Sequence, residues 1–114
     1  MKKLSLIGAI LLGILSFSVW AEEHADAALE HTKMAIVHGK AGHGPVLVEH
    51  ATVALEHANA AAGVAKGESK THMDAAVKSL ESAIAHGKME GAEHVSAATK
   101  SAEEAEEHIK AGNK

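Results

Sequence analysis

The chain contains no cysteine, no arginine and no tyrosine, and its only aromatic residues are Phe17 and Trp20. The absence of thiols excludes disulfides, thiolate metal sites and covalent haem attachment through Cys-x-x-Cys-His. With a net charge of −4, the chain also lacks the basic patch and stacking aromatics that nucleic acid requires. We therefore expect no nucleic-acid partner.

Proline occurs once, at Pro45, and β-branched residues form almost no runs. Alanine, glutamate, lysine and histidine dominate the chain after residue 21 instead. These residues are compatible with helix, and the breaks between them contain glycine. The composition therefore predicts an all-α protein.

The N-terminal segment is typical of a secretory signal peptide. Lys2 and Lys3 precede an apolar run at 4–15, and Val19-Trp20-Ala21 resembles a cleavage site. A membrane anchor is the alternative, but the run is shorter than the ~20 residues of a spanning helix. We expect signal peptide 1–21 to be cleaved after Ala21. A domain at 22–114 would then enter the periplasm as a cysteine-free monomer with no membrane attachment.

Glycines divide the rest of the chain into four predicted helices and a polar linker. Gly39 is expected to close the first helix in the αL conformation, and Pro45 to begin the second. Thr71 and Asp74 form a capping-box pattern for the third helix. The expected helices are about 23–38, 44–62, 71–87 and 92–111, in hairpins 23–62 and 71–111 joined by linker 63–70.

The second hairpin repeats the first. Residues 72–88 repeat 24–40 at an offset of 48, and the fourth helix repeats the second at an offset of 51. Two hairpins that each expose an apolar face predict an up-and-down antiparallel four-helix bundle. Ser79 and Ser101 occupy the positions that correspond to His31 and His50, and we expect them to lie opposite each other.

Apolar residues recur at alternating spacings of four and three, as in a bundle seam. Small side chains are frequent among them, so we expect modest stability without metal. The predicted core positions are Ala25, Leu29, Thr32, Ile36, Met73, Val77, Leu80, Ile84, Val95, Ala98, Ala102, Ala105 and Ile109.

Histidines recur every seven residues in the first hairpin, which places them along one face of each helix. In an antiparallel hairpin, two residues that face each other across the helices have residue numbers whose sum is the same for every facing pair. That rule predicts five histidine pairs across the two hairpins: His24 with His57, His31 with His50, His38 with His43, His72 with His108, and His86 with His94.

Imidazole ligands without thiolate suit Cu(II), Ni(II) and Zn(II), and Cu(II) generally binds such nitrogen sites most tightly. Successive pairs along a helix should lie ~10.5 Å apart, so each pair is expected to be a separate site. Additional ligands could come from Glu68, Glu90 and Glu104, which are each four residues from a paired histidine.

Cleavage after Ala21 would create a further site. The new terminus Glu22-Glu23-His24 would offer an amine, two backbone amides and an imidazole. Four nitrogens in a plane favour Cu(II) or Ni(II) over Zn(II). This site would compete with the His24 and His57 pair.

Two function classes other than metal binding are relevant to this sequence. A histidine-rich acidic bundle could be pH-responsive or purely structural, with no metal role. Catalysis is not expected, because there is no cysteine nucleophile and the imidazoles lie on the rim of the bundle without an enclosed pocket.

Several motifs resemble those of the bacterial small metal-binding protein family. They are His38-Gly-Lys-Ala-Gly-His43, Glu49-His50-Ala, Leu55-Glu-His57-Ala, His94-Val-Ser-Ala-Ala-Thr-Lys100 and Glu107-His108. The resemblance covers the whole chain after the signal peptide. It implies a periplasmic four-helix bundle that binds divalent metals, copper foremost, in metal buffering, storage or tolerance. It would make all ten histidines metal ligands, with Ser101 departing from the pattern.

Overall fold

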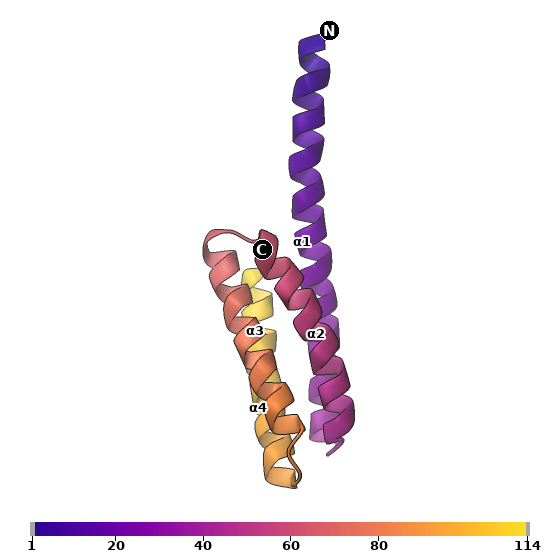
Figure 1. Cartoon of the computed structure of the whole chain (residues 1–114), viewed down its shortest axis with the longest axis vertical. Coiled ribbons are helices and arrows are strands. Elements are labelled where there is room, and N and C mark those ends of the chain that lie inside the picture. Colours follow the sequence, from indigo (N-terminus) through magenta and orange to yellow (C-terminus); the bar gives the residue numbers. More distant parts are fainter. Residues whose placement is uncertain (1, 114) are drawn as a thin grey trace.

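The computed structural model describes the backbone of residues 2–113 and the side chains of residues 19–113. The described chain consists of four helices and contains no strand. They are α1 (Lys2–Lys40), α2 (Gly44–Val64), α3 (Gly67–Gly87) and α4 (Ala92–Gly112) (Figure 1). The all-α prediction is confirmed.

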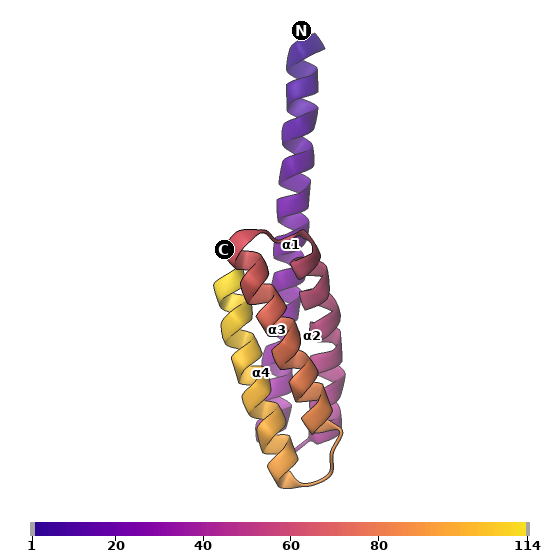
Figure 2. The ribbon, with the colours of Figure 1, turned by 60° about the vertical axis from the view of Figure 1, so that its left-hand side comes forward.

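The helices form an up-and-down bundle in which consecutive helices are neighbours. α1 packs on α2, α2 on α3, and α3 on α4, while α1 and α4 close the ring; α2 and α4 touch only slightly across the diagonal. Figure 2 shows this arrangement, with α1 projecting beyond the other helices at its N-terminal end. The predicted antiparallel four-helix bundle is therefore confirmed.

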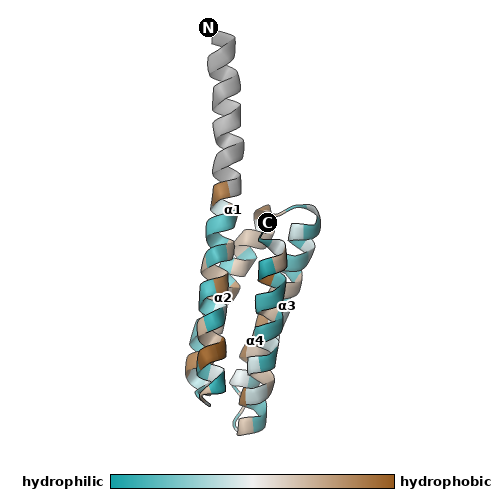
Figure 3. Cartoon of the chain, turned by 180° about the vertical axis from the view of Figure 1, so that it is seen from behind, coloured by the Kyte–Doolittle hydropathy of each residue, from teal (hydrophilic) through white to brown (hydrophobic). Residues whose placement is uncertain are grey.

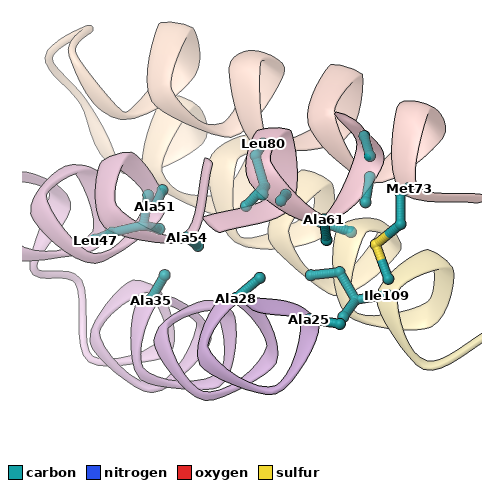
Figure 4. Packing of buried hydrophobic residues seen from close by; sticks show 14 of the residues in the cluster. Ala25, Ala28, Ala35, Leu47, Ala51, Ala54, Ala61, Met73, Leu80 and Ile109 are labelled. Carbon is teal, nitrogen blue, oxygen red and sulfur yellow. The ribbon is translucent and has the colours of Figure 1, made fainter. Parts of the chain in front are cut away.

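The core consists mainly of alanine. Leu47, Met73, Leu80 and Ile109 are the large side chains that are almost completely buried, and alanines from all four helices surround them (Figure 4). Most predicted core positions are buried, whereas Leu29, Val77, Ile84 and Val95 are only partly buried. Hydrophilic residues alternate with hydrophobic ones along the coloured parts of the four helices (Figure 3).

The first turn differs from the prediction. α1 continues to Lys40, and Gly39 lies inside it rather than ending it in the αL conformation. The positive φ of 81° belongs to Gly42, in the turn before α2. Position 39 has no room for a side chain, because an added Cβ would overlap Thr99 Oγ1 and lie 2.7 Å from Leu47 Cδ1.

The expected linker at 63–70 is also wrong, because only Ala65 and Lys66 lie between α2 and α3. Glycine at 67, with a φ of 61°, lets the chain reverse within this short connection. Thr71 is therefore inside α3, where its hydroxyl donates to the Gly67 carbonyl instead of capping the helix. Asp74 likewise pairs with Lys70 one turn earlier.

The expected signal peptide falls largely on residues 1–18, whose side chains lie outside the described part of the chain. Among the residues that are described, none of the helices combines the length and the apolar character needed to cross a membrane. Cleavage after Ala21 remains an expectation.

Replacing Gly39 with alanine tests whether the core depends on close helix packing. We expect Gly39→Ala to lower the free energy of unfolding by about 1–3 kcal/mol, because the new methyl group collides with Thr99 and Leu47. Urea denaturation followed by circular dichroism measures the change.

Gly63→Ala is the matched control, since Gly63 lies inside α2 and a Cβ there meets nothing within 4 Å. That substitution should stabilise the protein by about 0.4–1 kcal/mol. Equal effects of the two substitutions would contradict the packing argument.

Candidate metal-binding surface

The histidines of the first hairpin lie in two columns along the contact between α1 and α2. His24, His31 and His38 lie along α1, His50 and His57 lie along α2, and His43 is the N-cap residue of α2. Five of the six are half-buried and His43 is exposed, so water and ions reach these side chains. The seven-residue spacing keeps each column on one face of its helix.

The structure brings the first-hairpin histidines together in the predicted pairs. The Nδ1 atoms of His24 and His57 are 2.9 Å apart, and those of His31 and His50 are 3.3 Å apart. The third pair, His38 and His43, is wider, with ring centroids 5.9 Å apart. In a neutral pair at contact distance, one Nδ1 donates a hydrogen and the other accepts it. A metal ion bound by both nitrogens would replace this hydrogen, because each ligating nitrogen must be free of its proton.

The second hairpin contains two pairs. The Nδ1 atoms of His72 and His108 are 3.3 Å apart, which matches the His31 and His50 pair. The rings of His86 and His94 are nearly parallel, with centroids 6.0 Å apart. Here the Nδ1 atom of His86 is buried without a hydrogen-bond partner among the described residues. A coordinated ion would satisfy that nitrogen.

The two histidine surfaces lie on opposite sides of the bundle. One lies between α1 and α2 and the other between α3 and α4, while the α2–α3 and α4–α1 contacts form the remaining two sides. Ions on one surface are therefore separated from ions on the other by the alanine core.

Histidine rings also meet between successive pairs, which the sequence analysis did not anticipate. The His31 and His57 rings are nearly parallel with centroids 6.2 Å apart, and those of His38 and His50 are 5.5 Å apart. The expected spacing of ~10.5 Å considered only the helical rise along one helix. Rings on the facing helix lie between these positions, so neighbouring pairs come closer to each other than that spacing. We call these six rings, of His24, His57, His31, His50, His38 and His43, the imidazole ladder.

The central position of the second hairpin also differs from the expectation. Ser101 Oγ lies 3.1 Å from Ser82 Oγ, and its contact is therefore not with Ser79. A serine side chain is too short to reach along the hairpin, so the hydroxyl bonds to the nearest partner on α3. This hydroxyl pair interrupts the histidines of the second hairpin.

The predicted carboxylate ligands do not converge on the pairs. Glu68, Glu90 and Glu104 are all exposed. Within the described residues, no group of three or more histidine, aspartate or glutamate side chains is arranged to hold a metal ion. Glu22, the expected new terminus, is an exposed residue inside α1. Each pair therefore offers two imidazole ligands and leaves the other coordination positions to water.

Negative charge surrounds both surfaces. A glutamate directly precedes six of the histidines, and all six of these carboxylates are exposed: Glu23, Glu30, Glu49, Glu56, Glu93 and Glu107. Exposed carboxylates beside these surfaces raise the local concentration of cations. Glu106 accepts a 2.6 Å hydrogen bond from Lys110, which raises the pKa of Lys110 above its usual 10.5 and offsets one positive charge on α4.

Trp20 contacts the end of the imidazole ladder. Its ring meets that of His24 edge to face at a centroid distance of 4.3 Å. This contact was not expected from the sequence. The four-residue spacing could have indicated it, because it places both side chains on one face of α1. Cleavage after Ala21 would remove Trp20 and expose this end of the ladder.

A cleft of about 1080 Å³ lies at the other end of the bundle, between the α1–α2 and α3–α4 turns. Lys40, Lys88 and Lys100 line it together with five glycines, and no histidine does. The two histidine surfaces thus lie apart from this cleft.

Comparison with known proteins agrees with this arrangement. The search of curated proteins finds no match. A family model described as small metal-binding protein matches residues 1–112, which is nearly the whole chain. Its description names metal binding, and the structure supplies pairs of imidazoles at contact distance. The chain therefore belongs to the small metal-binding protein family.

Proposed function

We propose that this protein sequesters divalent metal ions at its five histidine pairs, binding Cu(II) most tightly and Ni(II) and Zn(II) less tightly. The observation that carries the proposal is the Nδ1 to Nδ1 separation of 2.9–3.3 Å in three of the pairs. These nitrogens belong to half-buried side chains that solvent reaches. Neutral imidazole nitrogen is a good ligand for all three metals, with Cu(II) bound most strongly.

The separations fit the geometry of these ions. With metal–nitrogen bonds of about 2.0–2.1 Å, nitrogens 2.9 Å apart subtend about 90° at the ion. A separation of 3.3 Å subtends about 107° at the same bond length. The His24 and His57 pair is thus suited to square-planar Cu(II) or Ni(II). The His31 and His50 pair and the His72 and His108 pair also suit tetrahedral Zn(II).

Two protein ligands per ion favour storage or buffering. The remaining positions go to water, so an ion can be taken up and released without rearrangement of the bundle. Such exposed ions can be passed to other molecules, which suits a role in copper tolerance. The absence of cysteine and the expected signal peptide support a periplasmic location.

Signal cleavage would add the N-terminal site. The first amides of a helix have no intrahelical acceptor, so a terminus at Glu22 frees those of Glu23 and His24. Together with the new amine and the His24 ring they would supply four nitrogens to Cu(II) or Ni(II). His24 would then serve either this site or its pair with His57.

Removing one pair tests the stoichiometry. Isothermal titration with Cu(II) at neutral pH should show up to five bound ions, and His72→Ala with His108→Ala should remove one. Ser79→Ala with Ser101→Ala is the control from the same hairpin and should keep all the sites. Unchanged stoichiometry after removal of the histidines would contradict binding at the pairs.

Copper should also stabilise the fold, because the pairs exist only when the helices are in register. Each site contributes about 2.7 kcal/mol at a free ion concentration 100 times its Kd. The melting temperature should rise by about 4–8 °C per kcal/mol. Differential scanning calorimetry with and without Cu(II) measures the shift, and no shift at saturating copper would oppose the proposal.

Affinity should depend on pH, because protons and metal compete for the same ring nitrogens. Metal binding should weaken as the pH falls, by up to about 100-fold per pH unit for a site of two histidines once both compete with protons. Competition with a chelator of known affinity at several pH values measures this. A bundle that unfolds in acid but binds no copper at neutral pH would favour the pH-responsive alternative.

A further inference from the structure

The imidazole ladder of the first hairpin is continuous. Its five ring-to-ring steps range from 5.1 to 6.2 Å between centroids. In centroid distance the steps within pairs and between pairs overlap, although contacts between Nδ1 atoms occur within pairs, and the rings of neighbouring pairs meet face to face. His50, for example, is 5.5 Å from His38 in the next pair and 5.6 Å from its own partner His31.

The second hairpin provides the contrast. Its rings meet within each pair, at 5.6 Å for His72 and His108 and 6.0 Å for His86 and His94. The positions that correspond to His31 and His50 are Ser79 and Ser101. Ser101 is engaged with Ser82 there, and a neutral hydroxyl is a much poorer ligand than imidazole for these ions.

We propose that a divalent ion bound on the first hairpin moves along the imidazole ladder by ligand exchange, whereas an ion on the second hairpin stays at its pair. This inference rests on the proposed function. In each step the ion gains a nitrogen of the next ring as it releases one of its two present ligands. The released nitrogen regains water, so no electron is transferred and no net charge is created.

His31 and His50 are the residues on which movement depends. Each contacts one ring of its own pair and one ring of a neighbouring pair, so it can serve two adjacent ion positions. The end residues His24 and His43 meet only one histidine ring each within the ladder. Loss of the central pair therefore divides the ladder, and loss of an end pair only shortens it.

The consequence is a path for bound ions about as long as the hairpin. An ion captured at the His24 end would reach the exposed His43 beside the turn while it stays bound to the ladder. The first hairpin would thus deliver ions to an acceptor at one end, and the second would retain them.

The test is nitrogen NMR of the imidazoles in the full chain, titrated with diamagnetic Zn(II) to one ion per protein. If the ion moves, all six ladder rings should shift together by the same fraction of their shifts at saturation. That fraction is about one fifth if all five pairs share the ion equally, and at most about one third if the ion stays on the three pairs of the ladder. The rings of the second hairpin should show either the full shift or none.

Two matched variants separate movement along the ladder from exchange through solvent. His31→Ala with His50→Ala should abolish the shared partial shifts, and His24→Ala with His57→Ala should leave them among the remaining four rings. Conversely, Ser79→His with Ser101→His should create shared shifts in the second hairpin. This last variant adds ligands, so it remains informative where removal of histidines impairs folding.

Each outcome is distinguishable. Shared partial shifts that survive removal of the central pair would overturn the proposal, since exchange would then occur through solvent. Full shifts confined to one pair at a time would also overturn it while leaving metal binding intact. If no imidazole in either hairpin shifts with Zn(II) or broadens with Cu(II), the proposed function itself fails.

Discussion

Close approach of the helices is the constraint on which the rest of the structure depends. The buried positions are mainly alanine, and Gly39 and Gly87 lie where any larger residue would strike a neighbouring helix. The distance between packed helices follows the size of the side chains at the contact. With small residues there, imidazoles on adjacent helices reach Nδ1 separations of 2.9–3.3 Å. Larger core residues would strengthen the core but separate the pairs.

The internal repeat explains why the two histidine surfaces lie on opposite sides. Gly39 packs against Thr99 of α4, and Gly87 packs against Val48 of α2. Gly39 and Gly87 correspond at the offset of 48, and Val48 and Thr99 correspond at the offset of 51. The hairpins thus meet through equivalent contacts, and their histidine surfaces therefore face in opposite directions. Differences between the surfaces, such as Ser101 for His50, then change one surface without disturbing the other.

The sequence was sufficient for the fold and for the pairing of histidines, because both follow from periodicity. Antiparallel helices place His24 opposite His57 because of their positions along the chain, and this does not depend on the side-chain rotamers. It was not sufficient for contacts that depend on where side chains point, such as the ring of His50 near that of His38. Likewise Gly39 was interpreted as a helix end, because its contact with Thr99 of α4 is formed only in the tertiary structure. Glu68 and Glu104 have suitable spacing, yet they face solvent rather than a pair.

The small core and the ligand pairs act on stability together. A buried alanine contributes one methyl group, on the order of 0.8 kcal/mol, whereas a buried leucine contributes about 1.5–3 kcal/mol. An ion held by His31 and His50 joins α1 to α2 and binds only when the two helices are in register. The free energy of metal binding would therefore add to the free energy of unfolding. Along the imidazole ladder such links can form from one end of the hairpin to the other, whereas the second hairpin has the Ser82 and Ser101 hydrogen bond at its centre. Met73, Leu80 and Ile109 pack in one cluster with Leu47 and with alanines of α1 and α2, so a link formed in either hairpin would stabilise the whole bundle.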